Sequence, residues 1–382
     1  MTDSLSDDTT ARRARIKCVV WDLDNTLWDG ILLESGDAAD VRPFPRVVEL
    51  IRLLDRRGIL NSIASRNDEQ AAMKRLAALG LADLFVYPQI GWNPKSESVA
   101  EVGRSLNFAT DALAFVDDDA FERAEVAHSL PDVFCLSPAD LDGVAELPEF
   151  MPRFVTSESA RRREMYRSQT VRESREQDFE GTPDEFLAEL EMVFTIRRAE
   201  VDDLQRAEEL TVRTNQLNST GRTYSYEELA ELATSSQHVL LVASLSDRFG
   251  DYGTIGLALA ERGTPHWHLK LLLMSCRTMS RGVGTILLGH VMALAKEAGA
   301  EALRADFVET GRNRMMRITY AFAGFSEIDK DESRLVLESD LSRIQEPAPC
   351  IRVIVESSSA IVESSSESGP SGIPAETGVT PS

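Results

Sequence analysis

The stretch IKCVVWDLDNTLWDG, residues 16–30, decides how the first half of the chain folds. It begins as a short apolar run rich in β-branched residues and ends in acid, which is typical of a buried parallel strand with Asp22 at its carboxyl end. Asp22, Asp24 and Thr26 form a DxDxT pattern. Two carboxylates at this spacing can share Mg²⁺, and the cation suppresses their mutual repulsion. We expect Asp22 to attack phosphorus as a nucleophile and Asp24 to act as general acid and base. Acidic residues are common in turns, so the pattern alone also fits a structural turn.

Strands and helices alternate after this stretch. Apolar runs end at Ser65 (ILNSIAS) and just before Asp117 and Asp118 (ALAFVDDD), and they are separated by segments with apolar residues at helical spacing. One of these segments, KSESVAEVGRSLN, begins at Lys95. The alternation predicts an α/β fold with a doubly wound parallel sheet, whose site lies at the carboxyl ends of the strands.

Polar residues at these strand ends have predicted roles in the same site. The hydroxyl of Ser65 can hold a phosphoryl oxygen, and the ammonium of Lys95 can neutralise charge that develops on the phosphoryl group. Asp117 and Asp118 would complete the Mg²⁺ site with oxygen ligands, together with Asp22 and Asp24. No insertion of domain size interrupts these elements, so we expect a capless site that is open to a bulky or protein-borne substrate.

Composition limits the other possibilities. The 382 residues suffice for two domains, and 43% hydrophobic with 27% charged residues is typical of globular proteins. No apolar run reaches the roughly 18 residues of a membrane span, and the polar N-terminus lacks a signal-peptide core, so we expect a cytoplasmic protein. The net charge of −22 opposes nucleic-acid binding. The four cysteines form no CxxC pair, which argues against zinc and disulfides.

Changes in composition divide the chain into segments. We predict a phosphotransfer domain over residues 14–145, an arginine-rich linker or helix over 146–181, a second α/β domain with a mixed sheet over 182–345, and a disordered tail over 356–382, which is rich in Ser, Gly, Pro and Glu. The arginine-rich segment has two interpretations. It is a solvated helix face, or its basic stripe receives an acidic partner. Its arginines are Arg161, Arg162, Arg163, Arg167, Arg172 and Arg175.

Together, these motifs resemble known families. The ordered set of Asp22, Ser65, Lys95 and the paired aspartates is similar to the four motifs of the haloacid-dehalogenase (HAD) superfamily. Longer stretches resemble the FkbH-like family, HAD subfamily IIIC; among them are KCVVWDLDNTLWDGIL, WNPKSES, FVDDDAFERAEV, RTNQLNSTGRTYS and LLMSCRTMSRGVGTILL. The resemblance extends from about residue 16 to residue 325. Arg66 and Asp119 depart from it, since lysine and asparagine are usual there.

The resemblance implies an activity in polyketide biosynthesis. Such a protein dephosphorylates 1,3-bisphosphoglycerate and loads the glyceryl group onto the phosphopantetheine thiol of an acyl carrier protein. The segment MSCRTMSRGVGTILLGHVM is also similar to the acyl-CoA-binding segment of the N-acetyltransferase (GNAT) fold. Backbone amides at Arg281, Gly282 and Gly284 would hold a phosphate of the pantetheine arm. A Mg-dependent HAD phosphatase of a small phosphoester, with a structural GNAT-like domain, is the alternative.

Cys276 lies beside this glycine-rich turn and next to Arg277. A guanidinium and a helix N-terminus would favour its thiolate, which could carry the glyceryl group as a thioester. An inert, buried cysteine is the other interpretation. Asn215, Gln216 and Asn218 could bind glycerate hydroxyls, or they cap a helix.

Overall fold

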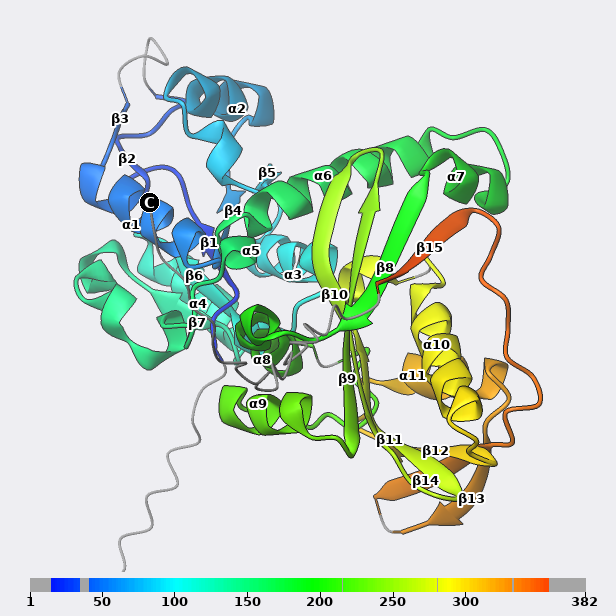
Figure 1. The fold of residues 1–382 in the computed structure, drawn as a ribbon. Helices are drawn as coiled ribbons and strands as arrows, with labels where there is room; N and C mark the ends of the chain where they lie inside the picture. Colours follow the sequence, from blue (N-terminus) through cyan, green and yellow to red (C-terminus); the bar gives the residue numbers. More distant parts are fainter. Residues whose placement is uncertain (1–14, 35–40, 215, 280, 332, 357–382) are drawn as a thin grey trace, which may run out of the picture.

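The structure, a computed structural model, describes residues 15–34, 41–214, 216–279, 281–331 and 333–356. Two α/β domains lie side by side, each built around its own sheet, and helix α6 runs from one to the other (Figure 1). The predicted fold class, a doubly wound parallel sheet followed by a mixed α/β domain, is confirmed.

The first domain contains a parallel sheet of five strands within the described residues, in the order β5-β4-β1-β6-β7. Strand β1 lies in the middle of the sheet, and every side chain from Cys18 to Trp21 is therefore buried. Chain order reverses between β1 and β6, and in doubly wound sheets ligands bind at the carboxyl ends of strands beside such a reversal. The strands are β1 (Cys18–Trp21), β4 (Leu60–Ser65), β5 (Gln89–Ile90), β6 (Leu113–Val116) and β7 (Phe134–Leu136); β2 (Trp28–Asp29) and β3 (Arg42–Pro43) form a separate hairpin.

Helices cover both faces of this sheet. Val19 and Trp21 share a core with α1 and α2, whereas Cys18 and Val20 share another core with α3 and α4. The alternation of side chains along β1 therefore supplies two apolar side chains to each layer. The helices are α1 (Pro45–Arg56), α2 (Glu69–Ala78), α3 (Lys95–Leu106) and α4 (Ala120–Ser129). No cap domain interrupts the described elements, as predicted.

The second domain contains a mixed sheet of eight strands in the part of the chain that the structure describes, in the order β13-β14-β12-β11-β10-β9-β8-β15. Its strands are β8 (Met192–Arg198), β9 (His238–Asp247), β10 (Gly250–Glu261), β11 (His266–Met274), β12 (Ala302–Val308), β13 (Ser326–Lys330), β14 (Arg334–Ser339) and β15 (Ile351–Glu356). Its helices are α7 (Pro183–Glu189), α8 (Leu204–Arg213), α9 (Tyr226–Thr234), α10 (Val283–Glu297) and α11 (Arg314–Phe322).

Strands β11 and β12 separate along their length. They pair in parallel only from His266 to Leu269, and beyond that point the segment Leu217–Ser219 lies between them. Met274 N donates to Leu217 O at 2.8 Å, and Val308 N donates to Ser219 O at 3.0 Å. The chain itself therefore satisfies backbone groups that the divergence of the two strands leaves unpaired.

The second domain extends beyond the predicted boundary at residue 345. Strand β15 pairs in parallel with β8 over six residues, so Glu356, which was assigned to the disordered tail, ends a strand. The sequence signal for this strand is short and lies next to the Ser-rich segment. The rest of that predicted tail, 357–382, lies outside the described residues. In the described chain, no helix has the length and apolar character that crossing a membrane requires.

In helix α6 (Arg162–Gln177), Arg167 and Arg175 are exposed, as on a solvated helix face, whereas Arg162 and Arg172 are buried against carboxylates of this chain. Tyr166 is buried in the core of the first domain. Arg172 is completely buried and donates to Asp247 of β9 at 2.6 and 2.9 Å. The acidic partners are this chain's own carboxylates, and sequence spacing did not show them because they lie far away along the chain.

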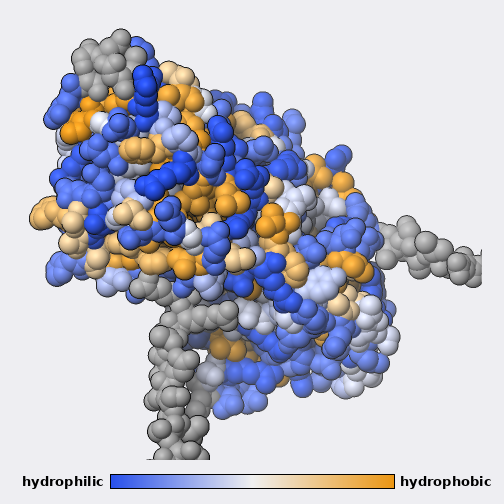
Figure 2. Space-filling view, turned by 90° about the vertical axis from the view of Figure 1, so that its left-hand side faces the viewer, coloured by the Kyte–Doolittle hydropathy of each residue, from blue (hydrophilic) through white to orange (hydrophobic). Residues whose placement is uncertain are grey.

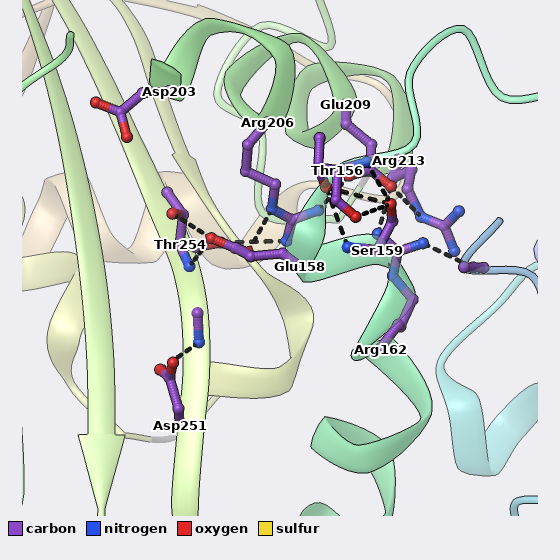
Figure 3. Close-up of polar contacts among 12 residues, drawn as sticks. Thr156, Glu158, Ser159, Arg162, Asp203, Arg206, Glu209, Arg213, Asp251 and Thr254 are labelled. Carbon is purple, nitrogen blue, oxygen red and sulfur yellow. Dashed lines mark hydrogen bonds and ion pairs between the residues drawn. The ribbon is translucent and has the colours of Figure 1, made fainter. Parts of the chain in front are cut away.

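Buried ion pairs also join the short helix α5 (Ser157–Ala160) and α6 to the second domain (Figure 3). Arg206 of α8 contacts Glu158 and Glu209, each at 2.8 Å, while Arg162 donates to Glu209 and to Gly58 O. Burial alone would raise the pKa of Glu209, but the surrounding guanidiniums, chiefly Arg162 and Arg206, hold it well below its usual range. The interface is therefore fixed by charge-assisted hydrogen bonds as well as by apolar packing.

Replacing Arg172 by Met should destabilise the protein by about 3–5 kcal/mol, because the Asp247 carboxylate would stay buried without a countercharge. The matched control is Arg167→Met. Its partner Asp83 is 76% exposed and Arg167 itself is 48% exposed, so the loss should stay below about 1 kcal/mol. Urea unfolding of both variants measures the difference, and equal midpoints would contradict a buried Arg172–Asp247 pair.

Candidate active site

The predicted site residues of the first domain gather at the carboxyl edge of its sheet. Asp22 directly follows β1, Ser65 ends β4, and Asp117 directly follows β6. Lys95 is the first residue of α3, whose N-terminus lies at the same edge. Glu125 of α4 fixes this N-terminus, because its carboxylate accepts hydrogen bonds from the backbone N–H and the hydroxyl of Ser96.

The ammonium of Lys95 lies at the centre of this group. Its Nζ is 2.5 Å from Asp22 Oδ1 and 3.0 Å from Asp117 Oδ2, and it donates to Ala64 O at 2.8 Å. Lys95 is only 3% exposed. Burial opposes its charge, but Asp22 and Asp117 raise its pKa above the ordinary lysine value, so it remains an ammonium. A fixed positive charge therefore lies beside the carboxylate that is expected to attack phosphorus.

Three carboxylates are close enough to hold one cation. Asp22, Asp117 and Asp118 each offer an oxygen, and these oxygens lie within 4.8 Å of one another. Asp117 Oδ2 is buried and, among the described residues, accepts no well-aligned hydrogen bond. Three acids face one lysine here, so the site has excess negative charge and hard oxygen donors, which fit Mg²⁺.

Electrostatics in the metal-free site agree with this assignment. Burial, together with the charge of Asp117, raises the pKa of Asp22 to about 6 despite the opposing ammonium of Lys95. Burial and the charge of Asp117 also raise the pKa of Asp118. Carboxylates that are held together against their repulsion are stabilised when a cation binds.

The side chain of Asp24 does not belong to this group, contrary to the prediction that it is a metal ligand. Its Oδ1 accepts hydrogen bonds from Trp28 Nε1 at 2.8 Å and from Leu32 N at 3.1 Å, while Oδ2 accepts one from Asn67 at 3.0 Å. The turn that follows β1 directs the carboxylate towards these donors. Asp24 is thus held in one orientation next to the metal group, and its acid–base role stays a prediction.

Other contacts hold the loops of the site in place. Thr26 Oγ1 accepts a hydrogen bond from Asp118 N at 3.0 Å, which ties the loop after β1 to the loop after β6. Asp117 Oδ1 accepts from Asp119 N at 2.8 Å. Ser65 is buried and follows Ala64, whose carbonyl accepts a hydrogen bond from Lys95, and its role as a phosphoryl ligand stays a prediction.

Exposed apolar residues lie near the site residues along the chain. Figure 2 shows hydrophobic patches among mainly hydrophilic residues on the side of the molecule that the first domain occupies. Two exposed aromatic residues follow strands of the site: Trp92, 68% exposed, lies before Lys95, and Phe121, 71% exposed, lies after Asp119. Exposed aromatic residues next to a site suit contact with a large substrate.

The glycine-rich turn of the second domain differs in part from the prediction. Arg281 N donates to Thr278 O within the turn, and its guanidinium contacts Glu176 of α6 at 3.0 Å. Arg281 therefore joins α6 to α10, and its amide is already used. Gly282 and Gly284 line a cavity of about 290 Å³ at the start of α10. Ligand binding there stays a prediction.

Cys276 lies at the boundary between the two domains. It lines a cavity of about 420 Å³ together with Lys17 and Asn107 of the first domain and Arg213 and Gln216 of the second. Its neighbour Arg277 has its guanidinium 5.8 Å from the centre of the Tyr166 ring. A partly exposed thiol at a cavity is accessible, unlike Cys18, which is completely buried.

Cys276 and Asp22 lie at opposite edges of the parallel sheet. Lys17, which lines the Cys276 cavity, precedes β1, whereas Asp22 follows it; five residues of strand span roughly 16 Å. Helix α3 gives a second measure, because Lys95 at its start contacts Asp22 and Asn107 at its end lines the cavity, about 18 Å away along the helix. One small substrate cannot contact both groups at once.

The polar run near residue 216 has mainly structural contacts. Asn218 Oδ1 accepts hydrogen bonds from Thr220 N and Gly221 N, so it stabilises a turn. Gln216 forms two hydrogen bonds with Asn107, at 2.8 and 2.7 Å. Asn215 lies outside the described residues.

Sequence reasoning missed several residues that shape these sites. Trp28 and Asn67 orient Asp24, and their positions in WDLDNTLW and SRND were the available signals. Lys17 and Arg213 carry no motif, and only the fold places them beside Cys276.

No protein-family model matches the chain, and no curated protein does. Among solved structures, it is similar to the N-terminal part of the protein BF1531 from Bacteroides fragilis, which contains a phosphatase domain complexed with Mg, at 26% identity and a TM-score of 0.31. That match covers 36% of this chain and 41% of the other, so this chain spans less than half of that relative.

The chain is also similar to N-acetyltransferases. The ribosomal-protein-S18-alanine N-acetyltransferase from Escherichia coli matches at 16% identity and a TM-score of 0.32, covering 41% of this chain and 98% of the other. The PaiA N-acetyltransferase from Thermoplasma acidophilum, in complex with coenzyme A, matches at 19% identity and a TM-score of 0.32, covering 38% and 98%.

Mg²⁺ should raise the melting temperature by more at about pH 7.5 than at about pH 5. In the metal-free protein the pKa of Asp22 is raised, so its contribution to stability is present at low pH and is lost as pH rises from about 4 to about 6. Above that window the ionised carboxylate is free to bind the cation. Differential scanning fluorimetry with and without Mg²⁺ measures the shift.

Asp118→Asn should reduce the Mg²⁺-induced shift. Asp119→Asn is the matched control, because Asp119 lies next to Asp118 but its side chain caps α4, a role that asparagine can fill. A Mg²⁺ effect that is the same at both pH values, or equal in the two variants, would contradict the assigned ligands.

Proposed function

We propose that this chain is an aspartate-based phosphatase coupled to acyl transfer, which dephosphorylates 1,3-bisphosphoglycerate and loads the glyceryl group onto the phosphopantetheine thiol of an acyl carrier protein. The observation that carries the phosphatase half is the buried Lys95 ammonium between Asp22 and Asp117, beside a third carboxylate. The choice of substrate and carrier rests on the resemblance of the motifs to the FkbH-like family.

Phosphate removal follows from the positions of these side chains. A carboxylate oxygen of Asp22 attacks phosphorus, a phosphorus–oxygen bond forms, and the bond to the leaving oxygen breaks as Asp24 protonates that oxygen. Water then attacks the aspartyl-phosphate while Asp24 takes its proton, which regenerates Asp22. Lys95 stabilises the charge on the phosphoryl oxygens. Bound Mg²⁺, held by Asp22, Asp117 and Asp118, would supply further charge neutralisation.

Acyl transfer is assigned to the second site. Cys276 Sγ attacks the carbonyl carbon of the acyl phosphate, a carbon–sulfur bond forms, the bond from carbon to the phosphate oxygen breaks, and the thiol proton leaves on the released phosphate. The carrier thiol then takes the acyl group by thioester exchange. Support comes from the position of Cys276 at a cavity and from the glycine-rich turn nearby.

The separation of the sites divides the reaction into stages. Lys17, which lines the Cys276 cavity, and Asp22 lie at opposite ends of β1, roughly 16 Å apart along the strand. Acylation of Cys276 and hydrolysis of a phosphoester therefore act on the substrate in turn. The intermediate moves between them, either free in solution or attached to the carrier arm.

A plain phosphatase with a structural second domain is the alternative, and one observation favours it. The segment Leu217–Ser219 fills the opening between β11 and β12, and Arg281 is engaged by Glu176, so part of the surface expected to receive a pantetheine arm is occupied by this chain. In that case phosphate release would not depend on a carrier protein, and Cys276 would be replaceable.

Asp22→Asn should lower phosphate release from a phosphoester substrate by roughly 10³-fold or more, because the nucleophile is lost. Asp29→Asn is the control, since Asp29 is an exposed carboxylate of the hairpin that follows. A phosphate-release assay of purified protein with Mg²⁺ measures both. Normal turnover by the Asp22 variant would overturn the phosphatase half.

Cys276→Ala should abolish loading of a carrier protein while phosphate release from a phosphoester persists. Intact-protein mass spectrometry of a phosphopantetheinylated carrier after incubation with enzyme and 1,3-bisphosphoglycerate reads out the acyl group. Cys135→Ala is the matched control and should load the carrier normally. No glyceryl mass shift with the unmodified enzyme would favour the plain phosphatase, whereas equal loading by the Cys276 variant would exclude Cys276 as the residue that carries the acyl group.

A further inference from the structure

The cavity that holds Cys276 has an unusual charge for this protein. Four of its lining residues are basic: Lys17 and Arg104 from the first domain, and Arg213 and Arg312 from the second. No acidic residue is among its lining in the described chain. The whole protein carries a net charge of −22, so a cavity with only positive charges is opposite in sign to the average surface.

Arginines behind the cavity wall add to this positive charge. Among the described residues, Arg162, Arg206 and Arg213 share two acidic partners at the domain interface, Glu158 and Glu209. Arg213 Nη2 is buried and, in the described structure, donates no hydrogen bond. The ion-pair network therefore leaves a cation on the cavity side that the protein does not neutralise.

The pKa values of two basic groups are lowered, mainly by burial and then by neighbouring cations. Burial lowers the pKa of Lys17 to about 8, and the positive charge of the nearby Arg213 is the second cause. Burial and the charge of Arg162 lower the pKa of Arg213 to about 9. Arg277, next to Cys276, also has a buried Nη1 for which the described residues provide no acceptor. An anion in the cavity would relieve the repulsion among these groups.

Contacts between the domains keep the cavity in shape. Asn107 ends α3 and exchanges two hydrogen bonds with Gln216, and Lys17 Nζ donates to Arg213 O at 2.9 Å. The basic groups are therefore held in position before any ligand binds, which lowers the entropic cost of binding. The cavity volume of about 420 Å³ is within the range of small-molecule sites.

We infer that this cavity is a second anion site, separate from the metal group at Asp22, which binds the phosphate group of a small phosphorylated substrate beside the Cys276 thiol. Arg312 and Arg104 line its exposed part, while Lys17 and Arg213 line its inner part. The inference deepens the proposed function and rests on it only for the acylation of Cys276; anion binding does not require that step.

The chemistry of the cavity selects the ligand class. Guanidiniums and an ammonium favour a phosphate dianion over a neutral or cationic ligand. In an acyl phosphate, the phosphate is the leaving group, so cations beside the thiol would stabilise the charge that develops as it departs. The same cations would also hold inorganic phosphate or a phosphate monoester, and these two ligands therefore serve as probes of the site.

Site-resolved alkylation of Cys276 tests the inference on the full-length protein. Iodoacetamide labelling is followed by peptide mass spectrometry, with EDTA present so that Mg²⁺ at the Asp22 group does not contribute. Inorganic phosphate should slow alkylation of Cys276 in a saturable way, and 3-phosphoglycerate should do so at lower concentration. Cys135 serves as the internal reference, and chloride at equal ionic strength is the salt control.

Arg312→Gln should weaken the protection by phosphate roughly tenfold. Arg312 is exposed and makes no ion pair within the described residues, so the variant should fold normally. Arg52→Gln, an exposed arginine of α1, is the matched control. Protection equal to that by chloride, equal effects at Cys135, or equal affinity in both variants would overturn the inference.

The variant Asp22→Asn tests the anion site independently of the proposed phosphatase activity. It should lose phosphate release but keep the protection of Cys276. If protection is absent while Asp22 is still needed for turnover, the anion site is wrong and the phosphatase stands. If protection disappears with Asp22, phosphate binds at the phosphotransfer group and the inference fails.

Discussion

The burial of one ammonium organises the first domain. Lys95 is almost completely removed from water, and this is tolerated because Asp22, Asp117 and the carbonyl of Ala64 surround it. The group lies between the neighbouring strands β1 and β6, where the order of the strands along the chain reverses. It forms only when these strands are adjacent and α3 begins at Lys95. Its single positive charge balances two carboxylates only in part. A residual negative charge at a strand edge is what a divalent cation requires, and the fold thereby couples its own stability to metal chemistry.

Much of this arrangement could be predicted from the sequence. Short apolar runs that end in Asp22, Ser65 and Asp117 identify parallel strands, and parallel strands bring their carboxyl ends to one edge by geometry alone. The orientation of Asp24 could not be predicted, because it depends on Trp28 and Asn67, which approach it only after folding. Spacing places a residue on an element, whereas hydrogen-bond donors from other elements decide where its side chain points.

The contacts at the domain interface were even harder to predict from the sequence than the orientation of Asp24. The charges of α6 suggested a solvated helix, since a hydrophobic stripe is the usual sign of burial. Arg172 is nevertheless buried because Asp247 and the ring of Tyr252 surround its guanidinium. These partners come from β9 and β10, about 75 residues later in the chain. Ion pairs over such a sequence separation leave no local pattern, so the interface and the cavity beside Cys276 became visible only in the structure.

The double amide pair between Asn107 and Gln216, together with the buried arginines of α6, has a consequence for how such a protein would work. Contacts at several points hold the two domains together in the described structure, and they keep the thiol of Cys276 and the carboxylate of Asp22 at separate sites. Under the proposed function, the substrate therefore has to move between the two sites. A long, tethered prosthetic arm would span the distance between the sites without any rearrangement of the two domains. The flexibility that the reaction needs would then come from the arm and not from the protein.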